Sequence, residues 1–397
     1  MANDAVAGDA LRVAPAQPEA TEDPGLDAAV GAATASAVRG VLVAFTKDLV
    51  RGVDDTLATF LAAEVATLTE IDTAMGEFAA TARDCVLAGG KRVRPTFAYW
   101  GWRGVAGGAE PLPGVLPALA ALELLHTFAL VHDDVMDASD TRRGRPTAHR
   151  AAAARHVAAG HAGDPDRFGE AVAVLVGDLC MVWADRLLAH ATVPPARLLD
   201  VRRCYDQMRV EAVAGQYLDV LGENDAANWS LDRALRVARY KTASYTVQRP
   251  LLFGAALADA DADAPLTVAY NRYGLAVGEA FQLRDDLLGV YGDPATTGKP
   301  AGDDLRTGKP TALLMIARQL ATAAQRRALE RAGAVTGARE VARLAELVAD
   351  TGAVARVERM ISDRVAEALA ALDTASLDET ARTALTGLAT TATARRA

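Results

Sequence analysis

The chain has few cysteines, few aromatic residues and a deficit of positive charge. Its three cysteines, Cys85, Cys180 and Cys204, lie far apart and form no C-x-x-C pair, so neither a disulfide framework nor a structural zinc site is indicated. We therefore expect a reducing location, the cytoplasm. The formal net charge of -9 argues against nucleic acid as the main partner, because binding to a phosphate backbone normally requires a basic surface.

The sequence also lacks a segment typical of a membrane anchor or a secretory signal. Residues 1–24 are acidic and rich in alanine, without the basic start and apolar run of a signal peptide. The most apolar stretch, residues 114–131, contains Glu123 and His126 and leads directly into Asp133. A membrane span needs roughly twenty uninterrupted apolar residues. We expect a buried helix there and no stable membrane anchor.

Aliphatic residues at helical spacing are abundant. Hydrophobic residues make up 51% of the 397 positions and recur every three or four residues, without alternating β-branched runs, which predicts an all-α fold. Residues 1–40, rich in Ala, Asp, Gly and Pro, are expected to form a disordered tail, and residues 41–397 a single helical domain. Ser376 and Glu379 suggest a capping box for the last helix. The expected helices are 42–70, 72–88, 93–105, 114–138, 168–191, 195–221, 230–258, 265–291, 309–331, 338–350, 353–373 and 376–390.

An acidic cluster closes the most apolar of these helices. Asp133 and Asp137 are one helical turn apart, so their carboxylates point the same way at a separation of about 6 Å. A divalent cation would relieve their repulsion, and carboxylate oxygens suit Mg²⁺ that is shared with a substrate phosphate. For this segment taken alone, a solvated acidic helix end is an equal alternative.

A second acidic cluster, Asp285-Asp286, closes the helix expected at 265–291. Two such clusters on separate buried helices, each followed by a long basic loop, indicate a group of metal ions held across a cavity. Such a group needs a polyanionic ligand to balance it, and a diphosphate is the natural candidate.

Basic residues follow both acidic helix ends and one glycine pair. Scattered surface charge explains any one of them, but it explains this arrangement poorly in an acidic protein. Cations grouped beside a flexible turn indicate an anion clamp. The residues are Lys91, Arg92 and Arg94 after Gly89-Gly90, Arg142 and Arg143 after the first acidic cluster, and Lys299 and Lys309 after the second.

Together these motifs resemble those of the trans-isoprenyl diphosphate synthases, the polyprenyl synthetase family, over roughly residues 45–390. The resemblance implies an enzyme that condenses isopentenyl diphosphate head to tail with an allylic diphosphate. It also implies a homodimer, with a different subunit as partner the alternative. The product would be an all-trans prenyl diphosphate. The matching motifs are Gly89-Gly90-Lys91-Arg92-x-Arg94-Pro95, Asp133-Asp134-x-x-Asp137 with Thr141-Arg142-Arg143-Gly144, Glu211-x-x-x-Gly215-Gln216-x-x-Asp219, Lys241-Thr242, and Gln282-x-x-Asp285-Asp286 with Thr297-Gly298-Lys299 and Asp304.

The resemblance also implies a role for each of these residues. Three magnesium ions per site would be held by five aspartates: Asp133, Asp134, Asp137, Asp285 and Asp286. The substrate-binding residues would be Arg142, Lys241 and Lys299 for the allylic diphosphate, Lys91, Arg94, His126 and Arg143 for isopentenyl diphosphate, and also Lys309. Thr242 and Gln282, with Lys241, would be the catalytic groups beside the developing allylic cation. For Gln216 and Asp219, binding and structural bracing both remain open.

Two positions depart from the family pattern. Gly289 stands where the second aspartate motif often has a third aspartate. One metal ion is therefore expected to be more weakly held or more water-ligated, with activity retained because the first motif is complete. Pro310, between Lys309 and Thr311, is also unusual for the family.

Product length would be set just before the first aspartate motif. Phe128, five positions before Asp133 and about 7.5 Å along the helix axis, would form the floor of a hydrocarbon channel. Ala129 beside it is small, and Leu125, one turn deeper, could tune the floor. A single aromatic without an insertion in the motif resembles the geranylgeranyl (C20) diphosphate synthases, with a farnesyl (C15) product as the main alternative.

Two further alternatives are a class I terpene cyclase and a non-catalytic synthase subunit. A cyclase would not need a second diphosphate site, so the basic clamp at Lys91 and Arg94 favours a condensing enzyme. An inactive subunit would be expected to lose its aspartates or the clamp, and this sequence keeps both.

Overall fold

The structure, a computed structural model, describes residues 24–107, 112–226, 228–258, 260–261, 264–293 and 301–393. These residues are helical apart from turns, loops and one short hairpin, so the predicted all-α fold is confirmed. The chain divides into two compact units, residues 1–47 and residues 48–397. In the first unit, the described residues belong to the beginning of helix α1, which starts at Pro24. Residues 1–23 of the expected tail lie outside the described residues, so the division into tail and domain stays a prediction.

The helices follow one another with short connections in most places. Between α4 and α5, strands β1 (Thr141–Arg142) and β2 (Arg145–Pro146) pair antiparallel. The helical elements are α1 (Pro24–Thr69), α2 (Thr73–Leu87), α3 (Val93–Ala106), α4 (Leu112–Met136), α5 (Ala148–Ala158), α6 (Pro165–Leu188), α7 (Pro195–Asn224), α8 (Leu231–Val237), the π-helix η1 (Ala238–Gln248), α9 (Arg249–Leu257), α10 (Pro265–Tyr291), α12 (Asp303–Thr307), α13 (Ala312–Leu320), α14 (Ala323–Leu329), α15 (Ala338–Asp350), α16 (Ala353–Leu372) and α17 (Glu379–Thr393).

Local capping explains where the helices differ from those expected. The helix expected over 309–331 is two helices, because Thr322 and Gln325 form a capping box that starts α14. The predicted capping box at Ser376 is wrong. The last helix begins at Glu379, and the carboxylate of Asp378 accepts the backbone N–H of Ala381. Helix α5 was not expected from the sequence.

The helix expected over 230–258 is interrupted by the π-helix η1, which lies against α7. A Cβ atom on Gly215 of α7 would lie 2.2 Å from the backbone nitrogen of Lys241, so only glycine allows the two backbones to approach this closely. π-helical turns occur frequently at functional sites. Here η1 presents Lys241 and Thr242 beside the end of α4.

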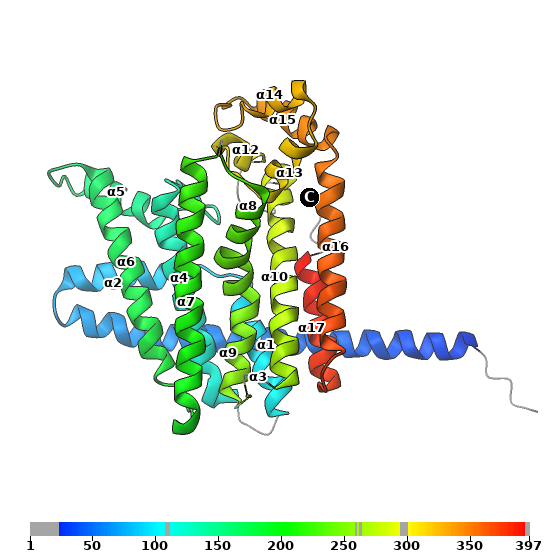
Figure 1. The fold of residues 1–397 in the computed structure, drawn as a ribbon. Helices are drawn as coiled ribbons and strands as arrows, with labels where there is room; N and C mark the ends of the chain where they lie inside the picture. Colours follow the sequence, from blue (N-terminus) through cyan, green and yellow to red (C-terminus); the bar gives the residue numbers. More distant parts are fainter. Residues whose placement is uncertain are drawn as a thin grey trace, which may run out of the picture. The chain divides into compact units, whose positions relative to one another are not determined.

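Helices α10 and α16 lie side by side, and the small helices α12 to α15 gather at one end of this pair (Figure 1). Between them lies an apolar core that includes Leu283, Leu305, Ile316 and Val357, each at most 1% exposed. This core fixes the end of α10 that bears Asp286 and places α12 beside it.

Helix α4 is packed against α6 and buries most of its apolar side chains. By length and composition it is the one helix among the described residues that could cross a membrane, but 61% of its most apolar stretch is buried inside the protein. A core helix passes the same test. The burial agrees with the expectation of a buried helix at this place.

Candidate active site

The C-terminal end of α4 brings the first acidic cluster into a network of charged side chains. Asp133 Oδ1 accepts hydrogen bonds from Lys241 Nζ of η1 at 2.9 Å and from Gln216 Nε2 of α7 at 3.0 Å. Burial disfavours the charged form of Asp133, but Lys241 and Arg142 outweigh burial and lower its pKa. Asp133 is therefore ionised and joins three elements that are far apart in the sequence.

The β-hairpin that follows α4 directs two arginines to different partners. Its turn residues Arg143 and Gly144 both have positive φ, 53° and 73°, as a tight two-residue turn requires. Arg142 Nε lies 2.8 and 2.9 Å from the two carboxylate oxygens of Asp134. Arg143 instead donates to the backbone oxygen of Gly89, so it lies beside the glycine pair that precedes the basic clamp.

Asp219 of α7, which is 5% exposed, holds two lysines together. Its Oδ2 atom accepts from Lys241 Nζ at 2.5 Å and from Lys309 Nζ at 2.8 Å. Burial and the neighbouring Lys309 disfavour the charge on Lys241, but Asp219 and Asp133 outweigh them and raise its pKa. Lys309 also lies 3.2 Å from Glu223 Oε1. The structure thus gives Asp219 a bracing role that the sequence left open.

The second acidic cluster lies at the end of α10. Asp286 is 4% exposed and accepts hydrogen bonds from Gln282 Nε2 at 2.8 Å and from the backbone N–H of Ala312 at 3.1 Å. Burial raises the pKa of Asp286 to about 7, and the carboxylate of Asp304 adds to this effect. Asp285 is half-buried beside it. Asp286 therefore lies close to two other carboxylates, those of Asp285 and Asp304.

The chemistry of these donors fits magnesium bound together with a diphosphate. Asp137 Oδ1 is buried and has no hydrogen-bond partner among the described residues. Burial and the charge of Asp133 raise the pKa of Asp137 to about 6, so a bound cation would favour the ionised form of this carboxylate. The described residues contain no group of three or more His, Cys, Asp or Glu arranged to hold a metal ion by themselves. Phosphate oxygens and water would have to complete the coordination, as Mg²⁺ commonly requires.

A second group of basic residues lies beside the glycine pair Gly89-Gly90. Arg94 donates to Thr246 Oγ1 at 2.8 Å, and its guanidinium lies 4.3 Å from the ring centre of Tyr245. The Nε atom of Arg94 and the Nδ1 atom of His126 are buried without partners among the described residues. Burial, Arg94 and Arg143 lower the pKa of His126 well below its ordinary value, so this imidazole is neutral. The Nε–H of Arg94 is therefore an unused donor that an anion could accept from.

Arg92, the central cation of the predicted clamp, does not belong to this group. It is 4% exposed and adopts a left-handed backbone conformation with φ 49°. Its guanidinium donates to Glu123 Oε2 at 2.7 Å and to Asp54 Oδ1 at 2.8 Å. Arg92 therefore joins α1 and α4 and is a structural residue.

The other predicted site residues have different environments. Lys91 is exposed, and Thr242 is half-buried on η1 next to Lys241. Lys299, together with Thr297 and Gly298, lies outside the described residues. The three chain-length candidates lie on α4: Leu125 is 1% exposed, while Phe128 and Ala129 are half-buried. Sequence reasoning missed Tyr245, whose position one turn after Lys241 was the available signal.

Comparison with known proteins agrees with this geometry. The family model described as polyprenyl synthetase matches residues 76–351. This range includes the charged network around Asp133 and Asp219 and the basic residues beside Gly89-Gly90. The chain belongs to the polyprenyl synthetase family. Dependence on magnesium is general among these prenyl diphosphate synthases.

Relatives in the polyprenyl synthetase family make products of different length. The geranylfarnesyl diphosphate synthase of Aeropyrum pernix is 31% identical over 274 residues, 68% of this chain and 78% of the relative. The geranylgeranyl diphosphate synthase of Mycobacterium tuberculosis is 38% identical over 259 residues, 64% of this chain and 68% of the relative. A solved geranylgeranyl pyrophosphate synthase from Corynebacterium glutamicum, complexed with isoprenyl diphosphate and magnesium, is 42% identical. Its TM-score is 0.84, and the match covers 88% of this chain and 99% of that one.

Proposed function

We propose that this polyprenyl synthetase condenses isopentenyl diphosphate with an allylic diphosphate, and that its main product is geranylgeranyl diphosphate. The observation that carries the proposal is the network in which Asp133, Asp219, Lys241 and Lys309 meet from separate elements. Such a network of acids and bases suits a metal-bound diphosphate, because it offers ligands to the metal and donors to the phosphate oxygens.

The residues of the network would divide the work of ionising the allylic substrate. Magnesium, when bound, would neutralise the charge of the departing diphosphate. We propose that three magnesium ions bind to the two acidic clusters. The ligands would be Asp133, Asp134 and Asp137 of the first cluster and Asp285 and Asp286 of the second. Arg142, Lys241 and Lys309 would donate to phosphate oxygens, and Asp219 would keep the two lysines in place.

The remaining polar groups would act on the second substrate and on the allylic cation. Arg94, Arg143, His126 and Lys91 would bind the diphosphate of isopentenyl diphosphate, whose double bond attacks the cation before a proton is lost. The oxygens of Thr242 and Gln282 would face the developing positive charge. The amide nitrogen of Gln282 is bonded to Asp286, which leaves its carbonyl oxygen for this purpose.

The C20 product is supported by relatives that make geranylgeranyl diphosphate and by the single aromatic, Phe128, before the first motif. The decisive experiment incubates the protein with isopentenyl diphosphate, Mg²⁺ and, separately, the C5, C10 and C15 allylic diphosphates. We expect an all-trans C20 diphosphate. A C15 product would change the assignment to a farnesyl diphosphate synthase. Absence of product from every primer would refute the proposed synthase activity.

The matched variant for this experiment is Asp133→Asn. It keeps the size of the side chain and an oxygen for Lys241, but it removes the charge needed for magnesium. We expect turnover to fall by orders of magnitude with an unchanged thermal unfolding temperature. Turnover equal to that of the wild type would exclude Asp133 from the metal site.

The second basic group favours a condensing enzyme over a terpene cyclase. A cyclase acts on one diphosphate, whereas here Arg94 has a buried Nε–H donor without a partner among the described residues, in a group separate from the lysines that Asp219 holds. We expect no hydrocarbon product when geranylgeranyl diphosphate is supplied with Mg²⁺ alone. Formation of a hydrocarbon under these conditions would support the cyclase.

We further propose that the enzyme is a homodimer. Helix α7 carries the exposed apolar residues Val210, Val213, Tyr217 and Leu221, spaced so that they form one stripe. A second copy of the chain would cover such a stripe. Light scattering during size-exclusion chromatography should give twice the mass of the chain, and Val213→Asp should reduce it to the monomer mass.

A cytoplasmic location is part of the same proposal. The three cysteines are free thiols, and burial raises the pKa of Cys85 and of Cys204 to about 11. Such thiols are unreactive, and a reducing compartment would keep them so. Fractionation of cells that express the protein should place it in the soluble fraction.

A further inference from the structure

Gly289 leaves a space on α10 that is filled by a carboxylate from another helix. It lies one turn after Asp285, where the family pattern often has a third aspartate. A Cβ atom on Gly289 would lie 2.1 Å from Asp304 Oδ2 and 2.6 Å from Asp304 Cγ. The carboxylate of Asp304 therefore occupies the position into which a side chain at residue 289 would extend.

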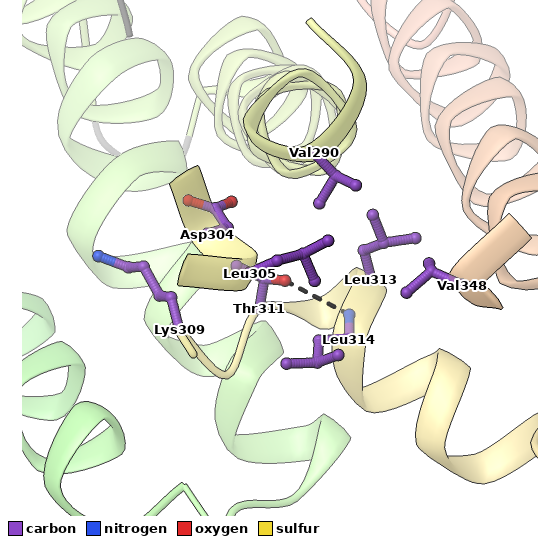
Figure 2. Close-up of a pocket in the computed structure, with 8 residues that line it drawn as sticks. All are labelled: Val290, Asp304, Leu305, Lys309, Thr311, Leu313, Leu314 and Val348. Carbon is purple, nitrogen blue, oxygen red and sulfur yellow. Dashed lines mark hydrogen bonds between the residues drawn. The ribbon is translucent and has the colours of Figure 1, made fainter. Parts of the chain in front are cut away.

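The position of Asp304 is fixed by its neighbour in α12. Leu305 is 1% exposed and packs with Val290, Leu313 and Val348 in a small pocket that Asp304 also lines, and the side chains of Asp304 and Leu305 extend in different directions (Figure 2). The backbone oxygen of Leu305 accepts the N–H of Gly333 at 2.9 Å. Burial of Leu305 thus holds the carboxylate of Asp304 over Gly289.

We infer that Asp304 supplies the third carboxylate of the second aspartate motif, and that Gly289 is required to make room for it. The inference rests on the proposed function. It replaces the expectation that one metal ion is held more weakly because Gly289 lacks a carboxylate. The acid is present at the expected turn of α10, but it is carried by α12.

A swap of the carboxylate between the two positions tests this inference. The variants are Asp304→Ala, Gly289→Asp and the double variant G289D/D304A. Electron paramagnetic resonance measures the binding of Mn²⁺ in the presence of inorganic pyrophosphate, which needs no turnover. We expect Asp304→Ala to weaken this binding about tenfold, as loss of a supporting acid does in other metal sites. Gly289→Asp should also weaken it, because the new side chain collides with Asp304.

In the double variant the collision is absent and the carboxylate is restored, so most of the lost Mn²⁺ affinity should return. Such a recovery is a coupling between the two positions that two independent defects would not show. Unchanged binding by Asp304→Ala, or a double variant that binds no better than the weaker single variant, would overturn the inference.

Asp303→Ala is the matched control, since it removes one carboxylate from the same helix without touching the space over Gly289. It should bind Mn²⁺ and pyrophosphate as the wild type does, and an equal loss of binding would also overturn the inference. Thermal unfolding of each variant checks the fold. Prenyl diphosphate synthesis by the wild type is measured in parallel, so that a failure of the proposed function is distinguished from a failure of the swap.

Discussion

Asp219 Oδ2 lies 2.5 Å from Lys241 Nζ and 2.8 Å from Lys309 Nζ, so one buried carboxylate holds two lysines side by side. Without it, the two ammonium groups would repel each other in a buried place. We therefore assign Asp219, the last residue of the motif that begins at Glu211, a bracing role: it positions the two lysines that we propose to bind the allylic diphosphate.

We predict that Asp219→Asn raises the KM for the allylic diphosphate about tenfold and leaves the KM for isopentenyl diphosphate nearly unchanged, because Arg94 and His126 lie in the other basic group. Steady-state kinetics with each substrate varied in turn measures both values. Asp219→Glu keeps the charge and should restore part of the loss. Equal effects on both substrates, or no rescue by glutamate, would contradict the bracing role.

Asp137 is expected to make the metal-free protein less stable as the pH rises. Its pKa is raised from 3.8 to about 6 by burial and by Asp133, so the folded state binds its proton more tightly than the unfolded state does. The stability of the metal-free protein should therefore fall as the pH rises from about 4 to about 6 through this group.

Asp137→Asn removes this ionisation, so its unfolding temperature in EDTA should exceed that of the wild type at pH 7.5 by more than at pH 4.5. The same variant should lose most of its synthase activity, because it lacks a carboxylate that we propose to hold magnesium. A gain in stability at the expense of function is common at such sites. Calorimetry at both pH values measures the difference. A stability difference that does not change with pH would mean that folding does not raise the pKa of Asp137.

Arg92 and Lys91 are adjacent cations with different roles. Arg92→Met leaves Glu123, itself 3% exposed, without its 2.7 Å partner, and breaking such a buried pair costs about 3–5 kcal/mol of unfolding free energy. Lys91→Met should leave stability within about 0.5 kcal/mol of the wild type, since Lys91 is exposed, and should raise the KM for isopentenyl diphosphate. Urea unfolding of both variants measures the contrast, and equal stabilities would remove the structural assignment of Arg92.

This contrast shows what the sequence could and could not predict. Helix ends bearing Asp133 and Asp285 were found because apolar periodicity stops there and charge begins. The structural role of Arg92 could not be predicted, because its partner Glu123 is 31 residues away in the chain and belongs to another helix. Tertiary packing decides which of Lys91, Arg92 and Arg94 becomes buried, and a local sequence pattern does not contain this information.

Other differences between expectation and structure have the same origin. The π-helix η1 lies where Gly215 closely approaches the backbone of Lys241, a contact between distant segments. Helix α5 has a weakly amphipathic, alanine-rich sequence, so its periodicity gave little signal. Gly289 lacks a carboxylate, and we infer that Asp304 of α12 replaces it. Only the fold brings Asp304 close to Gly289, so the sequence does not reveal this.

Phe128 is held in place by a histidine that packs against α6. The two rings of Phe128 and His132 meet edge to face with centroids 4.9 Å apart, and His132 Nε2 lies 2.9 Å from the backbone oxygen of Val174. A Cβ atom on Gly177 would lie 2.2 Å from this nitrogen, so His132 fits against α6 only at a glycine. The ring of Phe128 is therefore braced by His132, which itself packs on α6, and a channel floor requires such a fixed position.

We predict that Phe128→Ala lengthens the product beyond C20, because it removes the ring that would stop the growing chain. Chromatography of the dephosphorylated products measures their length. Ala129→Phe is the informative companion, since Ala129 shares the face of Asp133 whereas Phe128 faces His132. If the channel runs beside α6, Ala129→Phe should change product length less than Phe128→Ala does. An unchanged product from Phe128→Ala together with a C15 product from Ala129→Phe would move the floor to the other face of α4.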